Sequence, residues 1–144
     1  MKTIVVTCWY FNPIHPGHIE CFELSKMLGD ELRVIVNNDH QAQLKRWVKS
    51  FQDEQFRMRV VSSLKAVDKT ILSVDIDDSV CKSLDMVFTM IKDQYHNYVN
   101  IVFTKWWDRF VDNIPEVAIC KKHGVSIIDG LGLKTYHSRD FVIM

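Results

Sequence analysis

Residues 3–28 read TIVVTCWYFNPIHPGHIECFELSKML and decide the fold of this chain. The β-branched residues 4–6 are typical of a strand covered on both faces, and Pro13, Pro16 and Gly17 mark a turn after it. Apolar side chains then recur with a helical period, at Ile19, Phe22, Leu24, Met27 and Leu28, and Gly29 is a plausible stop past the last turn. The stretch therefore predicts a buried strand, a tight turn and a helix, with the functional site at the turn.

Two histidines, His15 and His18, stand at the predicted beginning of that helix. Unpaired N–H groups and the helix dipole favour bound anions at this place, and Gly17 lets the backbone approach a ligand closely. In a blander interpretation, the two histidines are polar loop residues or half of a metal site, because side chains at positions i and i+3 can share a face. We favour the anion-binding turn.

The composition of the 144 residues is that of one ordinary globular domain, because 47% are hydrophobic and 25% are charged. The formal net charge is zero, which argues against nucleic acid or an anionic membrane as the main partner. No apolar run reaches the ~18 residues of a membrane span, and the apolar N-terminal run is too short for a signal peptide. Four cysteines without a CxxC pair favour reduced, structural thiols, so we expect a cytoplasmic protein.

Residues 31–36 (ELRVIV) form a second predicted strand, so strand, helix and strand follow one another within about 35 residues. Such a unit implies parallel pairing and a right-handed crossover. Ligands of open α/β sheets bind outside the carboxyl ends of the strands. We therefore expect residues 7–12 and 37–39 to face one another across a site.

A short basic segment follows, with Lys45, Arg46 and Lys49 close together. Taken alone, such a cluster is usually a solvated face. A helix is predicted from about Asp53, and its expected inner face consists of Phe56, Val60, Val61 and Leu64.

The rest of the chain continues the alternation of strands and helices. Strands are predicted at residues 70–74, 100–104 and 125–129. One helix is expected from a cap at Ser79 to about Tyr95, with a core stripe of Val80, Leu84, Val87, Phe88 and Ile91, and another from Asn113 to about His123. The predicted fold class is α/β: a single domain over residues 1–144, built as a Rossmann-like sheet of five parallel strands with flanking helices.

The segment FNPIHPGH resembles the HxGH signature of the nucleotidylyltransferase superfamily. Members of this superfamily transfer a nucleoside monophosphate from CTP or ATP to a phosphorylated substrate and release pyrophosphate. The chain is similar, over about residues 3–142, to glycerol-phosphate cytidylyltransferases and heptose-phosphate adenylyltransferases, which carry a lysine-bearing loop after the second strand. The resemblance implies an enzyme that uses CTP or ATP with a sugar- or polyol-phosphate acceptor, with Mg²⁺ accompanying the nucleotide and no metal-binding residues of its own, and a homodimer.

The resemblance also implies roles for individual residues. The implied catalytic residues are His15, His18 and Lys45. The implied nucleotide-binding residues are Thr7, Tyr10, Phe11, Asn12, Gly17, Lys105, Asp108, Ser138 and Arg139. The implied acceptor-binding residues are Asn38, Asp39 and Arg57.

This chain departs from the relatives at several positions. Trp106 and Trp107 stand where relatives carry a glycine-rich turn, His137 stands in place of a serine, and Asn12 stands where many relatives have aspartate. These departures keep open a catalytically weak nucleotide-binding or sensing protein on the same fold. A more remote alternative is a flavodoxin-like or other doubly wound domain in which the HPGH sequence is a coincidence.

Overall fold

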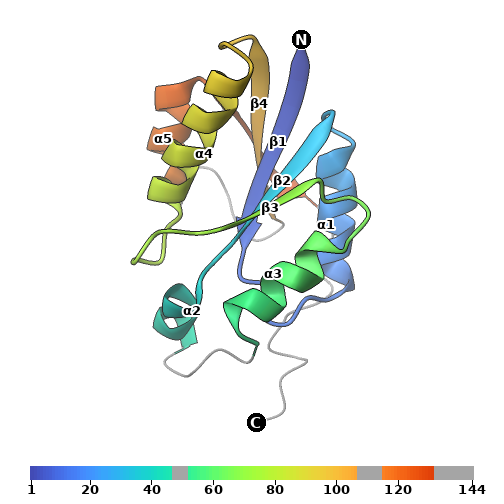
Figure 1. Ribbon diagram of the computed structural model, residues 1–144, viewed down its shortest axis with the longest axis vertical. Coiled ribbons are helices and arrows are strands. Elements are labelled where there is room, and N and C mark those ends of the chain that lie inside the picture. The colour runs from blue at the N-terminus through green and yellow to red at the C-terminus, as the bar shows by residue number, and fades with distance from the viewer. Residues whose placement is uncertain (47–51, 107–114, 132–144) are drawn as a thin grey trace.

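The computed structural model describes residues 1–46, 52–106 and 115–131, and within these ranges it shows a five-stranded parallel sheet with the order β3-β2-β1-β4-β5. The strands are β1 (Lys2–Trp9), β2 (Glu31–Val36), β3 (Lys69–Leu72), β4 (Val99–Trp106) and β5 (Ser126–Leu131). The helices are α1 (Pro16–Lys26), α2 (Asp39–Arg46), α3 (Glu54–Ser62), α4 (Cys81–Gln94) and α5 (Glu116–His123). Helices α1 and α3 cover one face of the sheet and α4 and α5 the other (Figure 1). The predicted fold class is therefore confirmed.

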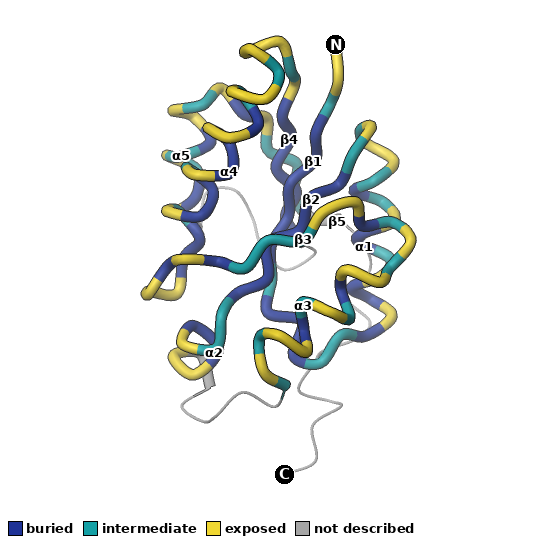
Figure 2. The backbone as a smooth tube through the Cα atoms, viewed as in Figure 1, coloured by how far each residue is buried: buried dark blue, intermediate teal, exposed yellow. Residues whose placement is uncertain are grey.

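The central strand β1 is buried on both faces, as its β-branched sequence predicted. Its residues alternate between two apolar clusters because successive side chains of a strand point to opposite faces. Ile4, Val6 and Cys8 pack in the cluster that includes α4 and α5, whereas Val5 packs in the cluster that includes Phe22 of α1. The buried strands run through the middle of the molecule, with exposed residues gathered on the outer helices (Figure 2).

The apolar period expected for α1 is only partly buried, because Phe22 lies inside whereas Ile19 is exposed. Met27 is 81% exposed, and Ile19 and Leu28 are also exposed. The buried residues of α1 are Gly17, His18, Cys21, Phe22 and Ser25. Small and polar side chains let the helix approach the sheet closely, and Ser25 Oγ lies 2.9 Å from Thr104 Oγ1 on β4. A hydrogen bond to the sheet, in addition to apolar burial, thus decides which face of α1 is inside.

Two further predictions about the first half of the chain need correction. Phe56 was expected inside but is 52% exposed, because Asp53 caps α3 and this places Arg57 and Val61 on the buried face. The segment expected as a lysine-bearing loop is helical as far as it is described, since α2 occupies Asp39–Arg46.

The core stripe predicted for α4 is confirmed in full, although Val80 rather than Ser79 is its N-cap residue.

Gly29 has a different role from the helix stop that the sequence predicted. Helix α1 already ends at Lys26, and Gly29 passes so close to β1 that an added Cβ atom would lie 2.8 Å from the Thr3 carbonyl oxygen and 2.8 Å from Val5 Cγ2. Such distances require the backbone to shift. The G29A variant should therefore lose roughly 1–3 kcal/mol of unfolding free energy, measured by urea denaturation. An unchanged midpoint would show that the α1–β2 connection adapts easily.

The four cysteines Cys8, Cys21, Cys81 and Cys120 are all free, as the sequence predicted. Burial raises the pKa of the Cys120 thiol to about 12, which keeps it protonated and chemically inert at neutral pH. Among the described residues, no helix combines the length and apolar character that a membrane crossing requires.

Candidate active site

The turn between β1 and α1 forms a reciprocal histidine cap. The Nδ1 atom of His15 accepts a hydrogen bond from the Gly17 backbone N–H at 3.1 Å, and the Nδ1 atom of His18 accepts one from the His15 backbone N–H at 3.1 Å. His15 is thus the N-cap and His18 the N3 residue of a capping box, with imidazoles in the positions that Ser or Thr and Glu or Gln usually take. The HPGH sequence therefore begins the helix by itself.

These two hydrogen bonds also fix the tautomer of each neutral imidazole. A nitrogen that accepts a hydrogen bond carries no proton, so in both rings the proton resides on Nε2. The two rings are stacked, with centroids 3.6 Å apart, and they are 4% (His15) and 1% (His18) exposed. The turn thus places two Nε2–H donors side by side at a helix N-terminus, where the helix dipole favours anions.

Phe11 supports the histidines from the core. Its ring meets the His18 ring edge-to-face at 5.1 Å and packs against Phe22 of α1 at the same centroid distance. The backbone of Phe11 has φ 55°, a left-handed conformation that is uncommon for a bulky residue and persists where the surroundings enforce it. The structure gives the Phe11 side chain a packing role, and its nucleotide contact stays a prediction.

Thr7 lies on the same side of the sheet as the two histidines. Its hydroxyl group donates to the Thr104 carbonyl oxygen at 3.0 Å, so it links the ends of β1 and β4. Asn12 accepts the Gln52 backbone N–H through Oδ1 at 2.8 Å. Both side chains are buried and hold the backbone around the histidine turn.

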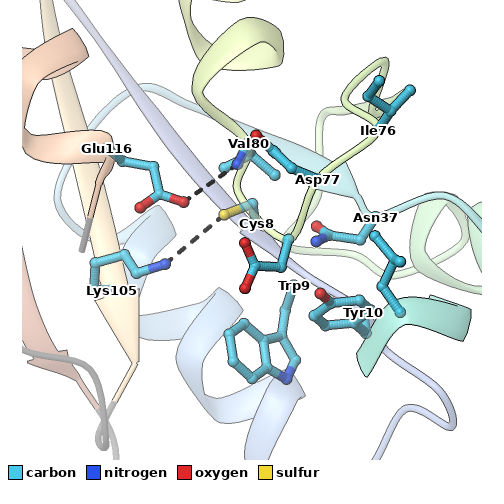
Figure 3. A pocket seen from close by; sticks show the side chains of 11 residues that line it. Cys8, Trp9, Tyr10, Asn37, Ile76, Asp77, Val80, Lys105 and Glu116 are labelled. Atoms are coloured by element: carbon cyan, nitrogen blue, oxygen red, sulfur yellow. Dashed lines mark hydrogen bonds between the residues drawn. The ribbon is translucent and has the colours of Figure 1, made fainter. Parts of the chain in front are cut away.

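A cavity of about 700 Å³ opens on the other side of β1. The lining comes from the carboxyl ends of β1, β2 and β4, from α2, from the connection between β3 and α4 and from the beginning of α5 (Figure 3). The lining residues are Cys8, Trp9, Tyr10, Asn37, Leu44, Ile76, Asp77, Asp78, Val80, Lys105 and Glu116. Cys8 and Val80 belong to the apolar cluster beneath α4 and α5, whereas Phe11 belongs to the cluster beneath α1. Trp9 lines the pocket and also packs against the cluster beneath α1, so the pocket extends around the end of β1 toward the histidine side of the sheet.

The pocket carries both signs of charge. The Ser79 hydroxyl and backbone N–H groups donate to Asp77 Oδ1, and these hydrogen bonds hold the pKa of the Asp77 carboxyl below its usual range. Lys105 lies opposite with its Nζ atom 5.8 Å from the centroid of the Trp9 ring. The volume lies within the range of about 300–1,000 Å³ that is common for small-molecule sites.

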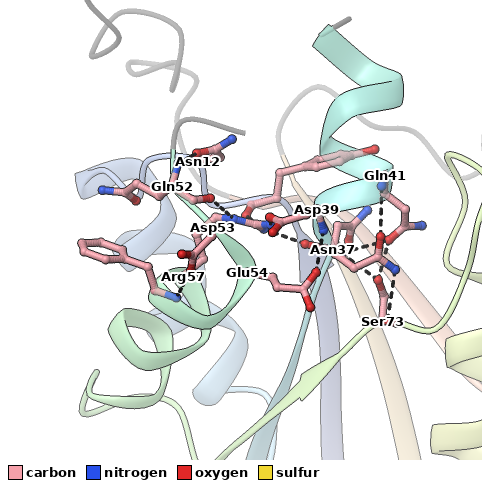
Figure 4. A network of polar contacts seen from close by, with 12 residues as sticks. Asn12, Asn37, Asp39, Gln41, Gln52, Asp53, Glu54, Arg57 and Ser73 are labelled. Atoms are coloured by element: carbon pink, nitrogen blue, oxygen red, sulfur yellow. Dashed lines mark hydrogen bonds and ion pairs between the residues drawn. The ribbon is translucent and has the colours of Figure 1, made fainter. Parts of the chain in front are cut away.

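A buried polar network ties the strand ends together (Figure 4). The guanidinium of Arg57, which is 1% exposed, donates through Nη1 to the carbonyl oxygens of Tyr10 at 2.7 Å and Asn37 at 2.6 Å. Its Nη2 atom pairs with Asp39 Oδ1 at 2.9 Å, and its Nε atom donates to the Gln52 carbonyl oxygen. Arg57 therefore clamps the ends of β1 and β2 to the beginning of α3.

Asn38 continues this network toward β3. Its Nδ2 atom donates to the carbonyl oxygens of Ser73 and Asp75, and its Oδ1 atom accepts the Gln41 backbone N–H. The three residues assigned to acceptor binding, Asn38, Asp39 and Arg57, are thus engaged with the chain itself. Their contact with a substrate stays a prediction.

The structure brings most of the predicted site residues to one edge of the sheet but divides them between two sides. The residues on the histidine side are Thr7, Phe11, Asn12, His15, Gly17 and His18, whereas Tyr10 and Lys105 line the pocket. Several predicted residues fall outside the described part of the chain, namely Asp108, Ser138 and Arg139, together with Trp107 and His137 and the side chains of Lys45 and Trp106.

Sequence reasoning missed several pocket residues, among them the acidic residues Asp77 and Glu116. Asp77 was interpreted as part of a solvated turn before α4, and Glu116 as the acidic first turn of α5. Both were explained by local helix chemistry, so no sequence signal distinguished them from surface residues. Asn37, by contrast, follows β2 directly and was expected at the site from the strand-end rule.

These features together define a Rossmann-like domain of the nucleotidyltransferase type, with two histidines at a helix N-terminus and a pocket at the carboxyl edge of the sheet. The sequence matches the cytidylyltransferase-like family over residues 7–138, so the chain belongs to that family. The chain is 48% identical over 73 residues to a protein named FAD synthase from Archaeoglobus profundus, covering 51% of this chain and 46% of that protein. It is 39% identical over 99 residues to another FAD synthase, from Methanolacinia petrolearia, covering 67% of this chain and 65% of the relative.

Solved structures agree with this assignment. A lipopolysaccharide core biosynthesis protein from Thermoplasma volcanium superposes with a TM-score of 0.64 at 25% identity, covering 93% of this chain and all of that one. A bifunctional NMN adenylyltransferase/ADP ribose pyrophosphatase from Francisella tularensis has a TM-score of 0.62 at 12% identity over 98% of this chain and 40% of that one, and shares the fold. The chain spans about half to two thirds of the length of the FAD synthases that it matches.

Proposed function

We propose that this protein transfers an adenylyl group from ATP to FMN or a closely similar phosphorylated acceptor and releases pyrophosphate. The observation that carries the proposal is the reciprocal cap of His15 and His18, which places two Nε2–H donors at the N-terminus of α1. The names of the FAD synthase relatives favour adenylyl transfer over cytidylyl transfer. FAD is AMP joined to FMN through a phosphoanhydride bond, so this proposed acceptor differs from the simple sugar- or polyol-phosphate that the family resemblance implied.

The reaction needs no covalent enzyme intermediate. An oxygen of the acceptor phosphate attacks the α-phosphorus of the nucleotide and forms a new P–O bond in line with the bond that breaks. The bridging oxygen between the α- and β-phosphorus keeps the electron pair and leaves as part of pyrophosphate. Negative charge shifts onto the α-phosphoryl oxygens and the leaving group, so catalysis consists of positioning and electrostatic stabilisation.

The histidine side of the sheet suits the nucleotide phosphates. His15 and His18 would donate from Nε2 to phosphoryl oxygens, with the dipole of α1 behind them. Lys45, Ser138 and Arg139 stay predicted phosphate contacts.

Mg²⁺ would enter as the counter-ion of the triphosphate. It usually binds to substrate phosphates and only one or two carboxylates, and the described residues contain no group of three or more His, Cys, Asp or Glu that could hold a metal by themselves. The predicted homodimer likewise stays a prediction.

The pocket suits the acceptor. It extends around the end of β1, the strand that leads into the histidine turn, so an acceptor in the pocket would place its phosphate near the nucleotide phosphates. Trp9 and Tyr10 line the pocket with aromatic surface, and their rings meet edge-to-face at 5.6 Å. A flat heteroaromatic ring is a natural occupant of such a wall.

The test is a pyrophosphate-release assay with ATP or CTP against FMN, glycerol 3-phosphate and a heptose phosphate. We expect turnover with ATP and FMN together, with formation of FAD confirmed by mass spectrometry. Turnover with CTP or with a sugar phosphate alone would contradict the proposed substrates but keep the enzyme class. Nucleotide binding without turnover on any acceptor would favour the catalytically weak binding or sensing protein.

A further inference from the structure

Glu116 presents an unused hydrogen-bond acceptor in the wall of the pocket. The residue is 3% exposed, and its Oε1 atom accepts the Val80 backbone N–H at 3.3 Å. Its Oε2 atom is buried and has no hydrogen-bond partner within the described ranges. Buried polar atoms are nearly always paired in folded proteins, so this oxygen is an acceptor that lacks its donor.

Lys105 places a cation in the same pocket. It is 2% exposed, its Nζ atom lies 3.9 Å from Cys8 Sγ and 5.3 Å from the centroid of the Phe103 ring. No carboxylate of residues 1–46, 52–106 or 115–131 lies within ion-pair distance of it. The ammonium and the Glu116 carboxylate thus both face the space around Cys8 (Figure 3) without pairing with each other.

The chemistry of the two groups restricts what can bind between them. An anion would be attracted by Lys105 but repelled by Glu116. A cation would be attracted by Glu116 but repelled by Lys105. A neutral group with an N–H donor beside a carbonyl acceptor satisfies both, because the N–H can donate to Glu116 Oε2 and the carbonyl oxygen can accept from Lys105 Nζ. Amide and imide edges of heteroaromatic rings have this pattern.

We propose that Lys105 and Glu116 recognise an imide edge of the acceptor and thereby determine its specificity. This inference rests on the proposed function, which assigns the pocket to the acceptor. The isoalloxazine ring of FMN carries such an edge, with the N3–H group between two carbonyl groups. Asn37 adds support from another side of the pocket: its Oδ1 atom is also buried and without a partner in the part of the chain that is described, and a ribityl hydroxyl could donate to it.

The experiment compares FMN with N3-methyl-FMN, which lacks the N–H donor but keeps both carbonyl groups. Binding is titrated by quenching of flavin fluorescence with the wild-type protein and the variants E116Q, K105M and E23Q. In E116Q the amide oxygen can still accept the Val80 N–H, so the local structure is kept while the Oε2 acceptor becomes a donor. E23Q makes the same chemical change at an exposed position of α1 and serves as the matched control.

We expect wild type and E23Q to bind FMN about 10- to 100-fold more tightly than N3-methyl-FMN, the range for a hydrogen bond to a charged group. E116Q should bind FMN about 10- to 100-fold more weakly than wild type and should no longer distinguish FMN from N3-methyl-FMN. K105M should lower the affinity for both flavins by a similar factor. The inference would be overturned if wild type bound the two flavins equally or did not bind FMN. It would also be overturned if E116Q lost affinity for FMN and for N3-methyl-FMN by the same factor.

The pyrophosphate assay separates this inference from the proposed function. Adenylylation of FMN without any effect of N3-methylation would leave the function standing and remove the roles assigned to Lys105 and Glu116. Binding that depends on N3–H, but without adenylyl transfer, would keep the recognition of the imide edge and remove the proposed activity.

Discussion

Replacement of His18 by glutamate should lower kcat by at least roughly 10²- to 10³-fold, the loss expected when one preorganised donor to a developing anion is removed. His18 accepts the His15 N–H through Nδ1, and its ring proton is therefore on Nε2. Glutamate is a usual N3 residue of a capping box, so its side-chain oxygen can keep the hydrogen bond to the His15 backbone. The Nε2–H donor is lost, because an ionised carboxylate only accepts hydrogen bonds.

The variant His18→Ala provides the comparison. It removes the same donor but also the cap, so it should lose about 0.5–2 kcal/mol of unfolding free energy in addition to activity. Steady-state kinetics and thermal unfolding of both variants separate the two contributions. A H18E protein with nearly normal kcat would show that His18 serves as a helix cap and has no part in the chemistry.

Replacement of Arg57 by methionine should lower the free energy of unfolding by about 3–5 kcal/mol, the loss typical of removing one partner from a buried charged network. Asp39, the ionic partner of Arg57, has a side chain that is 40% exposed and can be solvated when Arg57 is absent. Most of the loss therefore comes from the carbonyl oxygens of Tyr10 and Asn37, which lose the hydrogen bonds that they accept from Nη1. The methionine keeps the apolar stem of the arginine and avoids a large cavity.

Urea denaturation followed by circular dichroism measures this effect. Arg59→Met, on the exposed side of the same helix, is the matched control and should change stability by less than about 0.5 kcal/mol. An Arg57→Met protein as stable as wild type, but with a raised KM for the acceptor, would contradict the structural role. It would instead support the substrate contact that the family resemblance implied for Arg57.

The first 36 residues show how much the sequence alone could predict. A β-branched run, a turn with Pro13, Pro16 and Gly17 and a second β-branched run are local signals, and local signals set β1, the beginning of α1 and β2. The HPGH turn belongs to this group because the atoms that make its cap lie within three residues of one another. The Rossmann-like fold and the position of the histidines at a helix N-terminus were therefore available from the sequence.

The faces of the helices were decided only by the tertiary structure. In α1 and α3 some apolar residues of the helical period lie on the exposed side, among them Ile19 and Phe56. The buried faces of these helices include polar side chains. Ser25 of α1 contacts Thr104, and Arg57 of α3 donates to the carbonyl oxygens at the ends of β1 and β2. Such bonds join residues far apart in the chain, so no local period reports them.

The pocket was decided in the same way. Glu116 and Asp77 have sequence contexts that local helix and turn chemistry explains completely, and Lys105 gained its place in the pocket only when β4 paired beside β1. Parallel pairing brings the carboxyl ends of strands from distant parts of the chain to one edge of the sheet. The sequence by itself determined the fold and the histidine turn, because those depend on neighbouring residues. The tertiary structure alone decided which charged side chains are buried around the pocket, because that depends on strand order and long-range packing.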